Sequence, residues 1–350
     1  MHIQVSIVVF GLLAGLAKPH PRIPGQDKKE QQAPAQPVRD LRWHGDFGQG
    51  FGRYKNVHCG ANSTEPSACQ PNCSGPRCRM SVPWTHPHRG ADTLQINLLP
   101  GDNHPPDKPW GEGERNELVG PFYFEGDDVY YGWELWLPSK ERLPDPGPFQ
   151  GKTGDGLLFF QFHSVGECSA GGPNIGVGLS RTDVMPCPPR SPFPCGFQRG
   201  TQYQLALVGK SAYDYQDGER WWPPLGGGDP VVQRLGQATR YNLVLHVRWS
   251  SRRDVGLVEL FVNHVLVYRQ QRPTLYTWPS AACAADWYNP RTPGAAMPVY
   301  MKLGLYRGTP KAWAESLTLS RVRAGPTYAD AADCGVLFPP PSYCRPGFMP

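Results

Sequence analysis

Glycine and proline dominate this chain: each occurs 40 times among 350 residues, so together they form more than a fifth of the sequence. Average usage of the two combined is about 12%. Because Gly and Pro are the poorest helix formers, this excess argues against long helices and against a helical bundle. The chain also has 11 Trp, 15 Tyr and 14 Phe, which can supply a large core, so the composition does not imply disorder.

The first 40 residues differ in composition from the rest. Residues 3–16 are almost all apolar or small and lead into Ala17, which predicts a secretory signal peptide over residues 1–17. A buried N-terminal strand is the alternative. Residues 18–40 are rich in Pro, Gln, Lys and Glu and predict a linker before one domain over 41–350. No apolar run approaches the ~20 residues of a membrane-spanning helix. We therefore expect a secreted protein with no membrane partner.

The ten cysteines are an even number beside a predicted signal peptide, which favours disulfides. Four of them lie in a Cys-rich insert over residues 59–78, and their spacing does not match a zinc site. Asn62 and Asn72 begin triplets that fit the N-glycosylation pattern, which predicts a surface loop and a glycoprotein. The disulfide pairing cannot be read from the sequence.

The rest of the chain predicts β-strands, because it consists of short runs rich in aromatic and branched residues between Gly, Pro or Asp. These runs cover residues 129–137, 157–163, 201–208, 241–249, 255–268, 297–306 and 316–322. Asn263 and His264 predict a tight hairpin turn, and residues 311–314 a single helical turn. We expect most strand aromatics, such as Trp133 and Trp249, to lie in the core. The pattern predicts an all-β, concanavalin-like jelly-roll sandwich of two antiparallel sheets.

Four connections are long for such a sandwich, which is typical of functional or disulfide-pinned loops. They lie near residues 100–113, 164–200, 209–236 and 269–296.

Three of the strands each have one apolar face and one face of long polar groups, because successive side chains point to opposite faces. The polar faces carry Arg115 with Glu117, Phe159 with Gln161 and His163, and Tyr300 with Lys302 and Tyr306. If the strands share a sheet, these side chains line one groove. The alternative is an ordinary solvated face of an antiparallel sheet.

At these residues the sequence resembles the heparin-lyase-like polysaccharide lyases, which include glucuronan and related uronate lyases, and more distantly the jelly-roll alginate lyases. The resemblance covers roughly residues 112–325, through segments at 114–118 (ERNEL), 125–138, 159–163 (FFQFH), 241–250, 256–267 and 298–308 (PVYMKLGLYRG). The chain departs from the family in the 59–78 insert, a Pro-rich loop at 183–199, and Asn263-His264 in place of the usual Asn-Gly. The resemblance implies a concave sheet that binds an acidic polysaccharide, with His163, Lys302 and Tyr306 at catalytic or substrate-contacting positions.

Lyases of this kind cleave by β-elimination, which needs a base for the C5 proton and groups that neutralise the adjacent carboxylate. Arg115 and Gln161 suit the carboxylate, and His163 is the candidate base because its pKa lies near neutrality. Tyr306 could protonate the leaving O4, or could take the C5 proton if Lys302 lowers its pKa. We expect Glu117 to orient Arg115 rather than react. Further candidates for substrate contact are Tyr300, His246 and Arg248.

Two other classes of function compete with a lyase. A glycoside hydrolase needs two carboxylates ~5–10 Å apart, for which Glu117 and Glu134 are scattered candidates. A lectin-like module would use the same groove without catalysis. The net charge of +5 fits an anionic polymer, and no nucleic-acid-binding module is present in the sequence. We expect a monomer without a cofactor; Asp102, Asp127 and Asp128 are candidates for a calcium site, although no motif supports one.

Overall fold

In the computed structural model the chain divides into two units, Met1–Asp40 and Leu41–Pro350, and all strands and the helix described below belong to the second. The structure describes residues 40–45, 47, 56–59, 78–82, 93–102, 113–137, 157–165, 173–181, 203–210, 220–221, 231–235, 240–277, 295–307 and 315–332. The signal peptide, linker, glycosylation sites and helical turn predicted from the sequence lie outside these residues and stay predictions.

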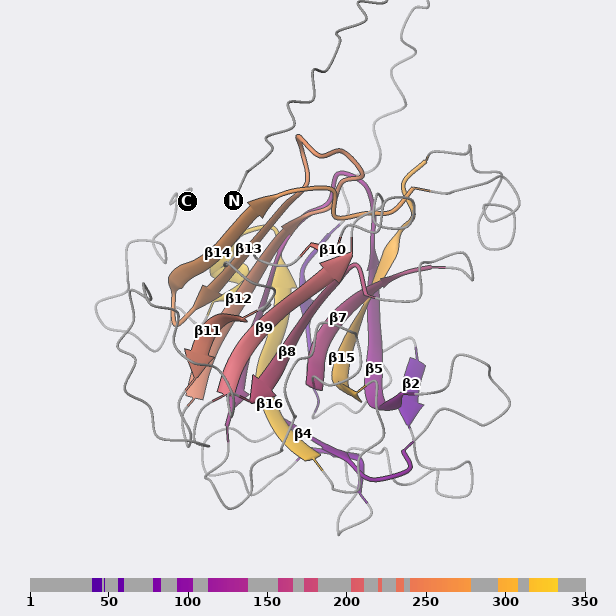
Figure 1. The fold of residues 1–350 in the computed structure, drawn as a ribbon, viewed down its shortest axis with the longest axis vertical. Helices are drawn as coiled ribbons and strands as arrows, with labels where there is room; N and C mark the ends of the chain where they lie inside the picture. The colour runs from indigo at the N-terminus through magenta and orange to yellow at the C-terminus, as the bar shows by residue number, and fades with distance from the viewer. Residues whose placement is uncertain are drawn as a thin grey trace, which may run out of the picture. The chain divides into compact units, whose positions relative to one another are not determined.

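The described strands form two antiparallel sheets (Figure 1). Sheet A has the order β14 (Val265–Gln271), β13 (Leu257–Val262), β12 (Arg240–Arg248), β6 (Asp128–Trp136), β16 (Glu315–Gly325), β4 (Thr93–Leu98) and β3 (Met80–Ser81), with β1 (Trp43–His44) paired to β16. Sheet B has the order β10 (Arg220–Trp221), β9 (Tyr203–Lys210), β8 (Ile175–Arg181), β7 (Leu157–Ser164), β15 (Val299–Arg307), β5 (Glu114–Tyr123) and β2 (Asn56–Cys59), with β11 (Val231–Leu235) paired to β9.

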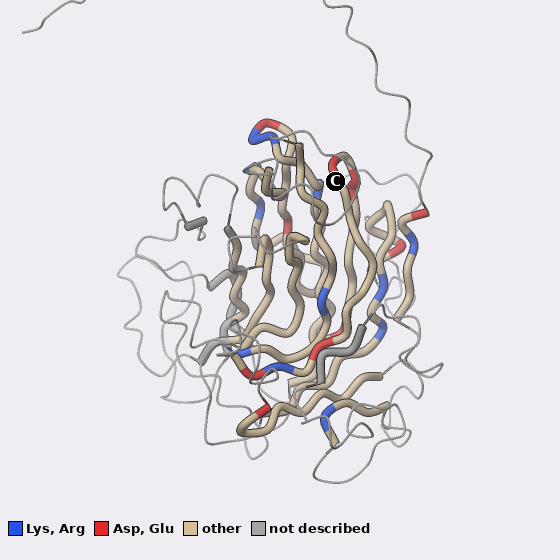
Figure 2. The backbone as a smooth tube through the Cα atoms, turned by 90° about the vertical axis from the view of Figure 1, so that its right-hand side faces the viewer, with Lys and Arg blue, Asp and Glu red and all other residues tan. Residues whose placement is uncertain are grey.

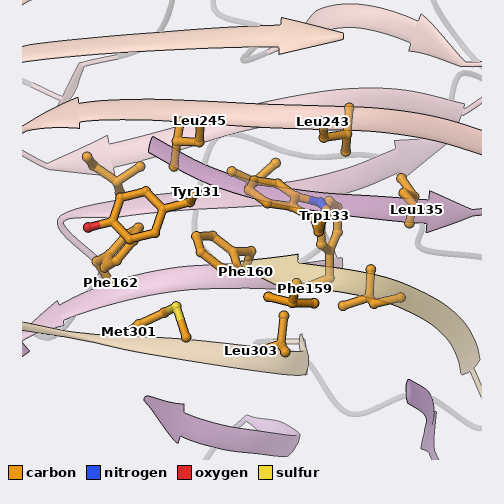
Figure 3. Packing of buried hydrophobic residues seen from close by; sticks show 14 of the residues in the cluster. Tyr131, Trp133, Leu135, Phe159, Phe160, Phe162, Leu243, Leu245, Met301 and Leu303 are labelled. Carbon is orange, nitrogen blue, oxygen red and sulfur yellow. The ribbon is translucent and has the colours of Figure 1, made fainter. Parts of the chain in front are cut away.

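One apolar core joins the inner faces of the two sheets (Figure 3). Trp133 of β6 stacks on Phe160 of β7 with ring centroids 4.5 Å apart, and Trp249 packs on Phe162 at 4.8 Å. Aromatic rings bury large apolar areas and prefer such offset or edge contacts, so they contribute strongly to the packing of the sandwich. The predicted core position of Trp133 and Trp249 and the predicted all-β sandwich of two antiparallel sheets are confirmed.

The seven predicted strand segments all contain strands, and the hairpin turn is confirmed. Asn263 and His264 have φ angles of 48° and 69°, the left-handed conformation that a tight turn between β13 and β14 requires. The expected loop over 164–200 is partly wrong, because it contains β8, an inner strand of sheet B. Gly176 and Gly178 weaken the strand signal of β8, and a Cβ on Gly178 would lie 2.7 Å from the Leu157 carbonyl oxygen.

Phe159 was expected on the polar face of its strand, and the structure corrects this. Both Phe159 and Phe160 belong to the core, because a β-bulge interrupts the pairing of β7 with β8 between Leu158 and Phe160. A bulge inserts one residue and reverses the alternation beyond it. Gln161 and His163 therefore still point away from the core.

Among the described residues, no helix has both the length and the apolar character needed to cross a membrane. The described helix, α3 (Tyr328–Ala331), packs on the outer face of sheet A. Cys78 is disulfide-bonded. The oxidation state of the other cysteines, whose side chains lie outside the described set, stays a prediction.

Candidate active site on the outer face of sheet B

Seven of the nine predicted site residues lie on one face of sheet B, on the adjacent strands β5, β15 and β7. This polar face comprises Arg115, Glu117, Gln161, His163, Tyr300, Lys302 and Tyr306. It points away from the core because alternate residues on the same strands, such as Leu118, Phe162 and Leu303, are core residues. The strand order brings together segments that are separated by up to 191 positions in the chain, from Arg115 to Tyr306.

The strand register decides which of these residues are neighbours. Lys302 lies opposite Gln161, Tyr300 lies opposite His163, and Tyr306 lies opposite Arg115. His163 and Tyr306 are thus not adjacent on the backbone. The pairing of β15 with β7 is irregular between Leu303 and Tyr306, so the strand is not uniformly extended between Tyr300 and Tyr306.

Gly304 lets β5 and β15 approach closely within this face. It lies opposite Glu117 with a φ angle of 153°, and a Cβ at this position would lie 2.1 Å from the carbonyl oxygen of Asn116. Any larger residue here would displace Glu117.

A buried chain of polar contacts runs beneath the partly exposed side chains. Lys302 Nζ donates to Glu117 Oε2 at 3.3 Å, and Gln161 Nε2 donates to Glu117 Oε1. Gln161 Oε1 in turn lies 3.0 Å from His163 Nε2. Glu117, Gln161 and Lys302 are 1%, 2% and 3% exposed. Glu117 was expected to orient Arg115, and the structure shows that it holds Gln161 and Lys302.

Burial shifts the pKa values of three members of the face. It lowers the pKa of the Lys302 ammonium, against the opposing charge of Glu117. Burial also raises the pKa of Tyr300 to about 12, with a further increase from Glu117, and raises the pKa of Tyr306. The charges of Glu117 and Arg115 act on both tyrosine hydroxyls, so the face behaves as one electrostatic unit.

Arg115 lies against Tyr306, with its guanidinium carbon 4.9 Å from the ring centroid. Its buried Nε has no hydrogen-bond partner among the described residues. The residue as a whole is only partly buried, and a guanidinium presents a planar fork that matches a carboxylate, so Arg115 suits an anionic group of a ligand.

Tyr300 supports the imidazole of His163. The two ring centroids are 6.1 Å apart with a 30° angle between the planes, and Phe122 packs on the other side of Tyr300 at 5.9 Å. This packing limits the orientations open to the tyrosine ring.

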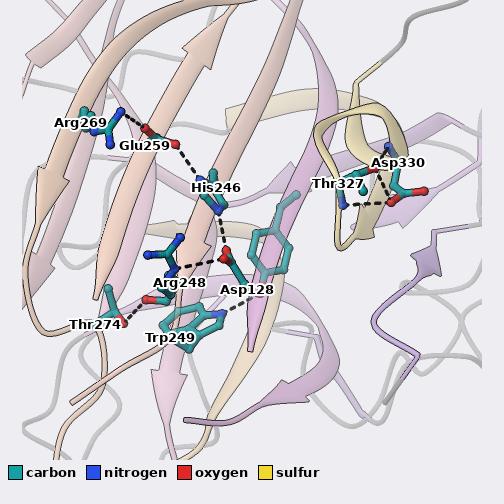
Figure 4. Close-up of polar contacts among 10 residues, drawn as sticks. Asp128, His246, Arg248, Trp249, Glu259, Arg269, Thr274, Thr327 and Asp330 are labelled. Atoms are coloured by element: carbon teal, nitrogen blue, oxygen red, sulfur yellow. Dashed lines mark hydrogen bonds and ion pairs between the residues drawn. The ribbon is translucent and has the colours of Figure 1, made fainter. Parts of the chain in front are cut away.

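His246 and Arg248 do not belong to the polar face, which corrects their expected place in the same groove. Both lie on β12 of sheet A, on the outer face of the opposite layer. His246 Nε2 is 2.6 Å from Asp128 Oδ1 and its Nδ1 is 2.7 Å from Glu259 Oε2, while Arg248 binds Asp128 at 3.1 Å (Figure 4). These bonds indicate a structural role in sheet A.

The carboxylates required for glycoside hydrolysis do not meet. Glu117 lies on sheet B and is bound by Lys302, whereas Glu134 lies on β6 of sheet A and accepts a hydrogen bond from Ser320 Oγ at 2.8 Å. Within the described part of the chain, no second carboxylate shares the polar face with Glu117.

The acidic residues considered for calcium are engaged by donors of the protein. Asp102 binds Arg79 at 2.6 Å and Asn116 at 2.8 Å, and Asp127 accepts from the Phe124 amide at 2.8 Å. The described residues contain no group of three or more His, Cys, Asp or Glu side chains that could hold a metal ion. Figure 2 shows that few positions along the described strands are Lys, Arg, Asp or Glu.

The fold and the polar face define an all-β sandwich of jelly-roll type with ionisable side chains on the outer face of one sheet. No protein-family model matches the chain. No curated protein matches it either.

The chain is similar to solved structures of polysaccharide lyases at low identity. An endo-β-1,4-glucuronan lyase from the fungus Trichoderma reesei is 14% identical, with 70% of this chain and 85% of that chain covered and a TM-score of 0.39. Alginate lyase Aly36B is 14% identical over 67% of this chain and 80% of that one, with a TM-score of 0.35. An alginate lyase from Alteromonas sp. 272 is 12% identical over 70% and 92%, with a TM-score of 0.36. The function proposed below rests on the geometry of the polar face.

Proposed function

We propose that this protein is a secreted polysaccharide lyase that cleaves a uronate-containing polysaccharide by β-elimination on the polar face. The observation that carries the proposal is the arrangement of His163 and Arg115 on one sheet face. His163 is held from below by the buried Gln161 amide, and the guanidinium of the partly exposed Arg115 lies on the same face against Tyr306. This combination provides a base and a carboxylate-binding cation on the same surface.

The substrate's C5 proton is weakly acidic while the neighbouring carboxylate is charged. Arg115 would bind that carboxylate and stabilise the enolate-like intermediate, a contribution of about 3–4 kcal/mol for one well-placed donor. Gln161 is almost fully buried and engaged at both ends of its amide, so we assign it to positioning His163 rather than to binding sugar.

In the reaction, the neutral His163 imidazole takes the C5 proton, and the electron pair of the C5–H bond forms the C4–C5 double bond. The C4–O4 bond breaks, and a tyrosine hydroxyl donates its proton to the departing O4. The imidazolium then returns its proton to the tyrosinate through solvent. No co-reactant is consumed.

Two tyrosines on the face can act as the proton donor. We assign Tyr306, because its ring contacts the guanidinium that would hold the substrate carboxylate. Tyr300 is the competing donor, because it lies beside His163. Both remain protonated at neutral pH, since burial raises the pKa of each.

The test is incubation with heparin, heparan sulfate, glucuronan, alginate and hyaluronan, read by the ultraviolet absorbance of the unsaturated uronate that only elimination creates. A lyase gives this product, and His163→Ala abolishes it in a protein with unchanged circular dichroism. His264→Asn, which changes a histidine on sheet A, is the matched control and retains activity. New reducing ends without the chromophore indicate a hydrolase, and binding without cleavage indicates a lectin; either result contradicts the proposal.

The location outside the cell is tested separately. Titration of the denatured, unreduced protein should find few free thiols among the ten cysteines, because secreted proteins fold in an oxidising compartment. Ten reactive thiols would contradict secretion.

A further inference from the structure

We propose that Glu117 and Gln161 fix the tautomer of His163, so that Nε2 carries the hydrogen and Nδ1 is the nitrogen that receives the substrate proton. The identity of the receiving nitrogen rests on the proposed lyase function. The tautomer itself follows from the contacts of the buried chain and can be measured without a substrate.

The argument begins at the ion pair of Lys302 with Glu117. The ammonium of Lys302 lies 3.3 Å from Glu117 Oε2, which favours the ionised carboxylate. An ionised carboxylate only accepts hydrogen bonds. The side chain of Gln161 must therefore turn its NH2 group toward Glu117 Oε1, as the structure shows.

The orientation of the Gln161 amide then determines the hydrogen on His163. With its nitrogen on Glu117, the amide presents Oε1 to His163 Nε2 at a distance of 3.0 Å. A carbonyl oxygen cannot donate, so Nε2 has to be the donor. A neutral imidazole has a single N–H, and its lone pair then resides on Nδ1.

Burial makes this assignment persistent. Glu117, Gln161 and Lys302 are at most 3% exposed, so water cannot readily replace one of these contacts. A reversed Gln161 amide would place its carbonyl oxygen against the Glu117 carboxylate, two acceptors with no hydrogen between them, and would leave that contact unsatisfied in a buried place. Glu117 is thus a positioning residue that acts on His163 through Gln161.

The direct measurement is a long-range ¹H–¹⁵N correlation spectrum of the full-length protein with ¹⁵N-labelled histidine, recorded above the pH at which His163 titrates. The signals of His163 are assigned by their loss in His163→Asn. The expected result is a protonated Nε2 and an unprotonated Nδ1. A protonated Nδ1 overturns the proposal.

A charge swap provides a second test with a readout that a merely structural role would not change. In Glu117→Gln/Gln161→Glu the same groups remain, but the carboxylate now lies directly beside His163 Nε2. We expect Nε2 to stay protonated and the titration midpoint of His163 to rise by about one to three pH units, as a contacting opposite charge predicts. An unchanged midpoint in the folded double variant would contradict the proposed contact.

A third variant removes the Gln161 acceptor from His163. Gln161→Leu should lower the share of the Nε2–H tautomer, whereas His264→Asn, in the turn between β13 and β14 of the other sheet, should leave the His163 spectrum unchanged. A single Nε2–H tautomer in Gln161→Leu would show that another group fixes the ring. Absence of lyase activity together with the Nε2–H tautomer would refute the proposed function alone, and activity together with the Nδ1–H tautomer would refute this inference alone.

Discussion

The imidazole of His246 lies flat on the ring of Tyr130, with ring centroids 3.9 Å apart and planes inclined by 2°. The two residues face each other across β12 and β6, and Tyr328 of α3 packs against the same tyrosine at 6.0 Å. Both ring nitrogens of His246 contact carboxylates, those of Asp128 and Glu259 (Figure 4). This environment favours the imidazolium, because only the protonated ring donates from both nitrogens.

The contacts of His246 predict a stability that falls as the pH rises. Burial by itself favours the neutral ring, but the hydrogen bonds and charges of Asp128 and Glu259 outweigh it and raise the pKa of His246 above its ordinary value. The folded state therefore binds this proton more tightly than the unfolded chain. The stabilisation is complete below about pH 6.5 and is lost as the pH rises through the folded-state pKa. Urea unfolding should show a difference between the wild type and His246→Gln that shrinks with increasing pH.

His264 offers a control of opposite sign. Burial lowers the pKa of His264, so the unfolded state binds its proton more tightly and folding is destabilised as the pH falls. In His264→Asn the relative stability should therefore improve at acidic pH. If both variants followed the same trend with pH, the contacts of His246 would not control the effect.

The ion pair of Lys302 with Glu117 should matter for stability as well as for the active site. Lys302→Met leaves the carboxylate of Glu117 buried without its cation, and loss of one member of a buried pair typically costs about 3–5 kcal/mol. The double variant Lys302→Met/Glu117→Leu should regain part of this loss, because it buries no unpaired charge, while the buried Gln161 Nε2 loses its acceptor. Chemical denaturation measures both free energies of unfolding.

The exposed pair of Arg252 with Asp254 serves as the control for this experiment. Its members are 67% and 69% exposed and 2.6 Å apart, so water and salt screen their interaction. Arg252→Ala should leave the unfolding midpoint unchanged. If the double variant Lys302→Met/Glu117→Leu were as unstable as Lys302→Met, lost packing rather than the unpaired charge of Glu117 would explain the lower free energy of unfolding.

The two tyrosines of the polar face should differ in their effect on the reaction. Tyr306→Phe removes the proposed proton donor and should lower kcat by about 100-fold or more, because general acid catalysis contributes about 10²–10⁴. Tyr300→Phe keeps the ring that packs on His163 and Phe122 and should cause a much smaller loss. Initial rates of unsaturated product formation measure both. The reverse order would identify Tyr300 as the donor.

The features that were predictable from the sequence depend on local patterns. The hairpin at Asn263 and His264 follows from two turn-forming residues between apolar runs, and the burial of Trp133 follows from its place in an aromatic strand. Alternation also identified Gln161 and His163 as residues of a polar face. The bulge that places Phe159 in the core depends on the pairing of β7 with β8, and the sequence of β7 by itself does not predict it.

Strand pairing explains the errors in the predicted site. Alternation correctly places His246 on a polar face, but it cannot specify the sheet that β12 joins, because that depends on pairing with β6 and β13. In the same way, Glu117 follows Arg115 by only two residues in the sequence, yet its partner Lys302 lies 185 residues away. Contacts of this range depend on the assembled sheet.

The close packing of α3 on Gly132 gives a last prediction. A Cβ at Gly132 would lie 1.8 Å from the carbonyl oxygen of Ala331, so Gly132→Ala should push α3 off sheet A at a cost of about 1–3 kcal/mol. The amides of Asp330 and Ala332, which are hydrogen-bonded within the turn, should then exchange faster with solvent. Thr327→Ala, which removes the helix cap but leaves the sheet contact, should cost only about 1 kcal/mol. Unchanged exchange in Gly132→Ala would show that α3 adapts to the added methyl group without leaving the sheet.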